Sequence, residues 1–457
     1  MCSMIVVAHK FPVETDTQQG QSRCVEASGG LATALRDITQ EPNNTWVAAC
    51  TAGLTPQQLS TCMPCHVAPV ALQQQLYGGF YWHTANGVLW PLYHSLPQYA
   101  EPLCQTHWQD YVQVNRAFAQ AAHRVAQPSK WVWIHDYQLS LVPAQLRHIG
   151  CSKKIAFFLH IPFPPWEILR TIPSHKQLLE GMLGADTIGF HTRTYQTHFL
   201  QCVSQALQAP TNTQGAVQHQ NRWIQTVTAP LGVAVHKIQR QVKKRRIQRA
   251  ATKLRQHINS KHFVLGIDRL DYTKGIDAKL RIVEATLQQH PSMRNNFKLL
   301  QLCVPTRQRL QPYRELKTTV QQLATRVNTQ FGHCGHCPVT LLHGSLPYID
   351  LLAWYAAADM ILVTPWRDGM NLVAQEYVAA RAPNAGSLIL SRHAGAAQQI
   401  LQDATLIDPK QTQESGQRLA QELTKPDSQK AANMQQLLQQ LTQYDINSFT
   451  QACLPLG

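Results

Sequence analysis

Two cations on one turn offer a site for a diphosphate. Arg269 and Lys274 lie in the segment Asp268-Arg-Leu-Asp-Tyr-Thr-Lys-Gly, directly after the candidate strand Phe263–Ile267. Cations that converge on one loop can neutralise the charge of a departing diphosphate without a metal ion. The alternative is that both side chains form surface ion pairs with Asp268 and Asp271.

A second segment in the same half of the chain combines a carboxylate, a tight turn and a helix start. It reads Thr364-Pro-Trp-Arg-Asp-Gly-Met-Asn-Leu-Val-Ala-Gln-Glu. The turn at Asp368 exposes backbone, and a helix starting near Leu372 would direct its positive end toward a ligand. Glu376, one turn into that helix, is placed to accept hydrogen bonds from sugar hydroxyls. Arg307, after the run Lys298–Val304, adds a further cation.

The first half of the chain carries its own candidates. Asp136 follows an apolar run, and open α/β sheets bind ligands at the carboxyl ends of their strands; a helix cap by Asp136 fits about equally well. His160 ends another run before a proline-rich turn, although a lone histidine is usually a satisfied core residue. Gly29 and Gly30 precede a helical pattern, where backbone N–H groups can approach a phosphate.

Short apolar runs that alternate with helical patterns must position these residues. Such alternation predicts parallel sheets covered on both faces by helices. Proline and glycine in Ala229–Val233 interrupt the pattern and indicate a domain boundary. The sequence therefore predicts an α/β fold with two Rossmann-like domains, residues 1–233 and 234–440, followed by a final helical segment, residues 441–457. The strands that we expect are Met4–Ala8, Thr45–Ala49, Lys130–Ile134, Lys154–His160, Thr187–Phe190, Phe263–Ile267, Lys298–Val304, Met360–Thr364 and Ser387–Leu390.

Composition narrows the class of protein. The 457 residues carry a formal net charge of +15, which suits anionic partners. No secretory signal or membrane-spanning apolar stretch is evident, so we expect a cytoplasmic protein.

The twelve cysteines include two C-x-x-C pairs, Cys62/Cys65 and Cys334/Cys337, but their spacing is unlike that of compact zinc sites, and we expect no metal. The basic run from His236 to His257 has no interleaved aromatic residues, which favours one amphipathic helix with a solvated face over a nucleic-acid site.

The motifs in register resemble the trehalose-6-phosphate synthases, the retaining glycosyltransferases of family 20. The resemblance runs from about Met4 to Phe449 and includes Tyr81 and Val88-Leu-Trp-Pro. Its other motifs are His135-Asp-Tyr, His160-Ile-Pro-Phe-Pro, Gly189-Phe-His-Thr, Arg269-Leu-Asp-Tyr-Thr-Lys-Gly and Asp368-Gly-Met-Asn-Leu-Val-Ala-Gln-Glu. It implies a GT-B fold, two Rossmann-like domains facing across a cleft, with a final helix that returns to the first domain.

The resemblance also implies a reaction, glucosyl transfer from a nucleotide-glucose such as UDP-glucose to glucose 6-phosphate, without cofactor or metal. The residues implied in catalysis are His160, Asp136, Arg269 and Lys274. Those implied in donor binding are Gly29, Gly30, Arg269, Lys274, Leu346, Asp368, Gly369, Met370, Asn371, Leu372, Val373 and Glu376. Those implied in acceptor binding are Lys10, Tyr81, Trp90, Asp136 and Arg307.

Two departures from the family pattern fall on the acceptor side. Lys10 stands where the family usually has arginine, which keeps the charge and loses bidentate geometry. The loop Tyr81–Asn86 also differs from the usual asparagine-glycine-phenylalanine-serine. Glycerol 3-phosphate as acceptor, or a catalytically silent regulatory or nucleic-acid-binding scaffold, therefore stays open as an alternative. The expected partners are small-molecule substrates, and we expect neither a membrane nor nucleic acid as a partner. The sequence does not determine which base the nucleotide carries or whether the chain forms a homo-oligomer.

Overall fold

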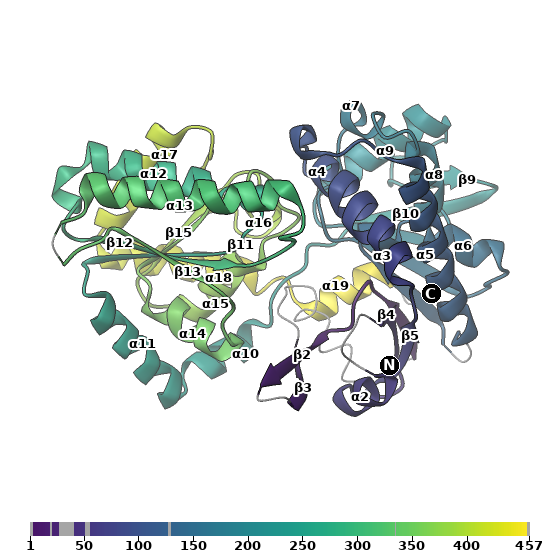
Figure 1. Cartoon of the computed structure of the whole chain (residues 1–457), viewed down its shortest axis with the longest axis horizontal. Helices are drawn as coiled ribbons and strands as arrows, with labels where there is room; N and C mark the ends of the chain where they lie inside the picture. The colour runs from purple at the N-terminus through teal and green to yellow at the C-terminus, as the bar shows by residue number, and fades with distance from the viewer. Residues whose placement is uncertain are drawn as a thin grey trace. The chain divides into compact units, whose positions relative to one another are not determined.

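The chain forms two compact units, each built around its own sheet (Figure 1). The computed structural model describes residues 3–18, 21–26, 41–50, 55–126, 129–333 and 335–454. Unit 1 comprises Met1–Leu231 and Ile446–Gly457, and unit 2 comprises Gly232–Asp445. The predicted phosphate-binding residues Gly29 and Gly30 lie outside the described residues.

Unit 1 contains an eight-stranded sheet that is parallel except at one edge, where β9 pairs antiparallel with β10. Apart from Arg222–Thr228 beside the antiparallel edge, its inner strands are mostly apolar, as expected for strands covered on both faces. In sheet order the strands are β5 (His66–Val70), β4 (Thr45–Ala49), β1 (Met4–Val7), β6 (Trp131–His135), β7 (Lys154–Leu159), β8 (Thr187–Phe190), β10 (Arg222–Thr228) and β9 (Val217–His219).

Helices surround this sheet, and one of them comes from the end of the chain. Helix α19 (Ile446–Cys453) contacts β8 and β10. Its Phe449 ring lies 5.5 Å from Trp133 and 4.7 Å from Phe158, so aromatic packing anchors the helix. A hairpin, β2 (Val13–Gln18) with β3 (Gln21–Glu26), pairs separately. The other helices are α2 (Pro56–Cys62), α3 (Gln74–Tyr77), η1 (Gly78–Leu89), α4 (Trp90–Tyr93), η2 (Pro97–Tyr99), α5 (Gln105–Arg124), η3 (Tyr137–Leu139), α6 (Val142–His148), α7 (Trp166–Leu169), α8 (His175–Met182) and α9 (Arg193–Leu207).

Unit 2 contains a six-stranded, all-parallel sheet with helices on both faces (Figure 1). Its strands, in sheet order, are β13 (Val339–His343), β12 (Phe297–Val304), β11 (His262–Arg269), β14 (Met360–Val363), β15 (Ser387–Ser391) and β16 (Thr405–Ile407). One face carries α12 (Ile276–Gln289), α13 (Gln311–Phe331) and α17 (Thr412–Thr424). The other carries α10 (Val235–Val242), α11 (Arg245–Ile258), α14 (Tyr348–Ala357), α15 (Leu372–Arg381) and α18 (Asp427–Leu441). Shorter helices are η4 (Tyr272–Lys274), η5 (Pro291–Met293) and α16 (Gly395–Gln399).

Two local expectations are wrong. The basic run forms two helices, α10 and α11, which are interrupted at Lys243 and Lys244. Ile238, Val242 and Ile247 are buried in the core of unit 2, and the interruption lets both apolar faces reach that core.

The segment around Tyr81 is also not a loop, because it lies within η1, a 12-residue π-helix. Wide helical turns of this type occur often at functional sites.

Candidate active site

The carboxyl ends of β11 and β14 bring a lysine and an aspartate of unit 2 together. Lys274, in η4 just after β11, places its Nζ 2.6 Å from Oδ2 of Asp368, which follows β14. The amide of Asn371 donates to the same oxygen at 3.0 Å. Both members of the ion pair are mostly buried, so the pair is held in one geometry. The sequence predicted each residue as a donor-site residue, and the structure places them in direct contact.

The turn that carries Lys274 requires a glycine. Gly275 has φ of +60°, and a Cβ there would lie 2.1 Å from the carbonyl oxygen of Thr364. No side chain fits at that distance, and the left-handed conformation disfavours other residues. The backbones of the two segments therefore approach closely, and this approach positions Lys274 beside Asp368.

A buried carboxylate holds two guanidinium groups beside this turn. Asp271 is fully buried, and its Oδ2 lies 3.2 Å from Arg307 and 3.8 Å from Arg269. Its other oxygen accepts hydrogen bonds from the backbone N–H and the hydroxyl of Thr273. Burial raises the pKa of Asp271, but Arg307, Arg269 and the Thr273 hydrogen bond outweigh burial, and the net pKa is lowered. The alternative of surface ion pairs therefore holds in part: Arg269 does pair with Asp271, but the carboxylate is buried and is not on the surface.

Asp268, the other carboxylate considered, pairs with a buried lysine. It accepts from Nζ of Lys279 at 2.5 Å, and Gln301 completes the buried group. Lys279 of α12 has no exposed side-chain surface, so its ion pair with Asp268 of β11 is buried between that helix and the sheet. Sequence reasoning missed Lys279, and its helical position next to apolar residues carries no signal that would have identified it.

Helix α15 begins where the second predicted segment places it. Asn371 caps the helix, has φ of +79°, and accepts a hydrogen bond from Ala374 N at 3.0 Å. Asparagine tolerates this conformation better than most residues. Of the other predicted donor residues, Leu346, Leu372 and Val373 are partly buried against the core, while Gly369 and Met370 form the turn before the cap.

Glu376 of α15 is buried and has an unusual pKa. The hydroxyl of Tyr355 donates to its Oε2 at 2.9 Å. Burial raises the pKa of Glu376 to about 7, although the Tyr355 hydrogen bond opposes the rise. The carboxyl group is therefore divided between its protonated and ionised forms at neutral pH, and it can either donate to or accept from a ligand hydroxyl.

Unit 1 places three histidines beside Asp136. Nε2 of His160 shares a hydrogen bond of 3.0 Å with Nδ1 of His135, and the ring of His191 lies 5.4 Å away. Burial lowers the pKa of His135 to about 3. Burial, His135 and His191 together lower the pKa of His160 well below its usual value. His160 is therefore neutral at physiological pH and is suited to hydrogen bonding, whereas His135 and His191 are neighbours that sequence reasoning quoted without assigning them a role.

Asp136 does not cap a helix, so that alternative is wrong. Its side chain makes no capping hydrogen bond to η3, although the residue stands directly before that helix. Instead its Oδ1 accepts from the backbone N–H of His160 at 3.2 Å. Its φ of +76° is rare for a residue other than glycine, and such backbone strain is concentrated at functional sites.

Two of the predicted acceptor residues meet in unit 1. Nζ of Lys10 lies 5.7 Å from the centre of the Tyr81 ring, within the range of a cation–π contact. Tyr81 in turn stacks on His9 and Tyr77, at 4.7 and 5.2 Å. Trp90 is buried separately, 4.2 Å from the ring of His94 and 5.7 Å from that of Tyr137. Arg307, which the resemblance also implies in acceptor binding, belongs to unit 2 beside Asp271.

The described residues contain neither a metal-binding cluster nor a membrane-spanning helix. In the described part of the chain, no group of three or more histidine, cysteine, aspartate or glutamate side chains is arranged to hold a metal ion. Of the two C-x-x-C pairs, Cys334 lies outside the described residues, while Cys62, Cys65 and Cys337 are free thiols. Within the same described ranges, no helix has the length and apolar character needed to cross a bilayer.

Comparison with known proteins gives consistent results over nearly the whole chain. The model of Glycosyltransferase family 20 matches residues 2–455. The Trehalose-6-phosphate synthase of Mycolicibacterium smegmatis is 34% identical over 98% of this chain and 91% of its own length. The alpha,alpha-trehalose-phosphate synthase [UDP-forming] of Emericella nidulans is also 34% identical, over 96% of this chain and 89% of its own length.

Solved structures that resemble this chain have names that point to the same family. The alpha,alpha-trehalose-phosphate synthase (UDP-forming) of Burkholderia xenovorans, in complex with glucose-6-phosphate, has a TM-score of 0.88 and 27% identity, over 98% of this chain and 97% of that one. An E. coli structure bound with UDP-2-fluoro glucose gives the same TM-score, identity and coverage. These matches confirm the α/β fold class and the GT-B architecture that the motifs implied. The chain belongs to glycosyltransferase family 20.

Proposed function

We propose that the protein transfers glucose from UDP-glucose to glucose 6-phosphate, with retention, to give α,α-trehalose 6-phosphate and UDP. The observation that carries this proposal is the group of side chains in unit 2 at the carboxyl ends of three neighbouring strands. Arg269 ends β11, Arg307 follows β12, and Asp368 follows β14 beside Lys274. The chemistry of this group suits a sugar diphosphate, because it combines three cations with one carboxylate, while the buried Asp271 holds two of the cations in place. The named activities of the relatives support the same reaction.

Unit 2 would bind the donor. Arg269 and Lys274 would hold the diphosphate, with Gly29 and Gly30 as additional predicted phosphate contacts. Asp368 would bind hydroxyls of the transferred glucose, since its ion pair with Lys274 links the sugar contact to the phosphate contact. The backbone of Leu372 and Val373, at the start of α15, would bind the nucleotide, and the buried Glu376 its ribose.

The acceptor would use mainly unit 1. Lys10 and Tyr81 would bind the 6-phosphate, and their cation–π contact supports this pairing because it orients the ammonium group. Arg307 of unit 2 would contribute a second cation. Asp136 would bind acceptor hydroxyls, and Trp90 would line the sugar pocket. His160, kept neutral, would offer a hydrogen bond near the anomeric carbon without adding charge.

Glucosyl transfer with retention would need no protein nucleophile. The bond between the anomeric carbon and the diphosphate oxygen breaks, and the acceptor hydroxyl forms the new bond on the same face. The proton of that hydroxyl passes to the departing diphosphate oxygen. Arg269 and Lys274 would stabilise the charge that develops on the leaving group, so positioning and electrostatics supply most of the rate enhancement.

The test is UDP release from UDP-glucose in EDTA, with glucose 6-phosphate, glycerol 3-phosphate or no acceptor. We expect fast release with glucose 6-phosphate only, together with a product that an α,α-trehalose 6-phosphate standard matches. Release with glycerol 3-phosphate alone would overturn the acceptor assignment and leave the donor site intact. No release with any acceptor would overturn the proposed activity.

A further inference from the structure

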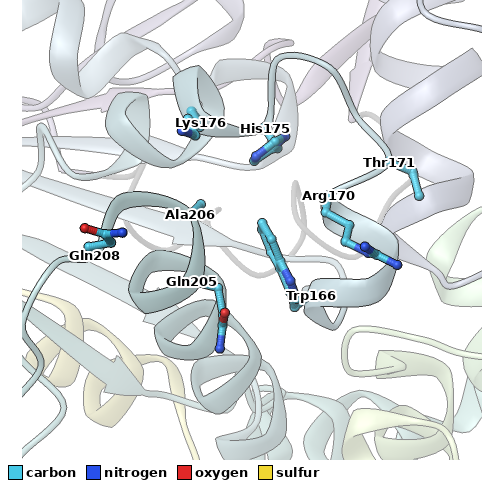
Figure 2. A pocket seen from close by; sticks show the side chains of 8 residues that line it. All are labelled: Trp166, Arg170, Thr171, His175, Lys176, Gln205, Ala206 and Gln208. Carbon is cyan, nitrogen blue, oxygen red and sulfur yellow. The ribbon is translucent and has the colours of Figure 1, made fainter.

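Unit 1 contains a pocket that none of the candidate active-site residues lines. It has a volume of about 630 Å³, within the usual range for small-molecule sites. Helices α7, α8 and α9 form it, together with the turn between α7 and α8 (Figure 2). Its lining residues are Trp166, Arg170, Thr171, His175, Lys176, Gln205, Ala206 and Gln208.

The charged side chains that line this pocket are all basic. Arg170 and Lys176 bring two cations, and none of the eight lining residues is acidic. Within the described ranges, neither cation forms an ion pair with a carboxylate. Cations that lack internal partners are available to an anionic ligand, and an arginine can bind two oxygens of one phosphate.

Hydrogen-bonding groups in the pocket are also available. Nδ1 of His175 lies 2.7 Å from the carbonyl oxygen of Ile172, and a carbonyl can only accept, so Nδ1 carries the proton. This leaves Nε2 of His175 able to accept from a ligand hydroxyl. The side-chain amides of Gln205 and Gln208 make no hydrogen bond to other described residues. Gln208 ends α9 with φ of +52°, a strained conformation for glutamine, at the rim of the pocket.

An aromatic surface completes the site. Trp166 is only partly buried, and its ring meets that of His175 edge to face, at 5.5 Å between centroids and 77° between planes. Figure 2 shows the indole standing among the other lining side chains. The contact with His175 holds the indole in place, and the apolar C–H face of a sugar ring can pack on such a surface.

We propose that this pocket is a second ligand site, and that it binds a phosphorylated monosaccharide. The phosphate contacts one of the two cations, Arg170 or Lys176, which lie on opposite sides of the pocket (Figure 2). The sugar ring packs on Trp166, and the hydroxyls bond to His175, Gln205 and Gln208. Free inorganic phosphate offers the same anion but makes no use of the indole or the amides. The site goes beyond the proposed function, because it shares no residue with the candidate active site.

Calorimetric titration of the full chain with glucose 6-phosphate tests this proposal. We expect two equivalents to bind the wild type and one to bind the double variant Arg170→Gln/Lys176→Gln. The matched control, Arg116→Gln/Arg124→Gln, removes two exposed cations from α5 and should keep two. Because all four side chains are exposed, we expect these variants to fold, and circular dichroism checks this.

A second variant separates a sugar phosphate from free phosphate. Trp166→Ala should weaken glucose 6-phosphate binding at this site about tenfold, as expected for the loss of an aromatic contact of roughly 1.4 kcal/mol. It should leave the binding of inorganic phosphate unchanged. Equal weakening of both probes, or no weakening of either, would overturn the assignment to a sugar phosphate.

Turnover measured on the same samples keeps the two proposals apart. One equivalent bound by the wild type, with normal UDP release, would overturn the second site and leave the proposed function standing. Two equivalents bound, with one lost in the pocket variant and no UDP release, would support the site and contradict the function.

Discussion

Replacing the buried Glu376 by glutamine is expected to stabilise unit 2 at pH 8 and to have little effect at pH 4. Burial raises the pKa of this carboxyl group from 4.5 to about 7, so the folded state holds the proton to higher pH than the unfolded state does. Between these two values the folded state binds more protons, and its stability therefore falls as pH rises. The loss is complete above about pH 7.

The structure gives the size of this effect. The difference between 4.5 and about 7 corresponds to about 3 kcal/mol of stability lost on ionisation. Glutamine has nearly the same shape, keeps an oxygen that can accept from the Tyr355 hydroxyl, and has no proton to lose. Glu376→Gln should therefore be more stable than the wild type by up to about 3 kcal/mol at pH 8. Tyr355→Phe should act in the opposite direction, because the Tyr355 hydrogen bond favours the ionised carboxylate.

Urea unfolding at pH 4, 6 and 8 measures these free energies for the wild type and both variants. Glu315→Gln is the matched control, because Glu315 is exposed on α13 and its replacement changes the same charge at the surface. We expect the control to follow the wild type at every pH. If the difference between Glu376→Gln and the wild type were the same at all three pH values, the account of a buried, protonated carboxyl group would be refuted.

Three further predictions concern the charged groups of the site. Asp271→Asn should lower stability by about 3–5 kcal/mol in urea unfolding, because Arg307 keeps a buried charge without its partner; a loss below 1 kcal/mol would contradict the anchor role. Lys274→Ala should lower kcat about 100-fold or more with an unchanged circular dichroism spectrum, and near-normal turnover would exclude it as a clamp. Lys10→Arg should change KM for glucose 6-phosphate and not for UDP-glucose, so a changed donor KM would remove Lys10 from the acceptor site.

The sequence alone determined the α/β class, the family and most of the strands. Continuous apolar runs identify strands that are buried on both faces, and the strands β1, β4, β6, β7, β8, β11, β12, β14 and β15 were all expected within a few residues. Of the unexpected strands, β5, β9, β13 and β16 are sheet edges, β10 lies next to one of them, and β2 and β3 pair only with each other. Edge strands are shorter or partly exposed, so their sequences lack continuous apolar runs.

Only the tertiary structure decided which charged groups meet. Asp368 lies 94 positions from Lys274 in the chain, and Asp271 lies 36 positions from Arg307, yet each pair is in contact. Motif order identified these residues individually but could not assign the partners, because strand order in a parallel sheet is a property of the whole fold. The same holds for the burial of Glu376. Its neighbours in sequence are those of an ordinary helix, and its raised pKa results from the packing of α15 against α14.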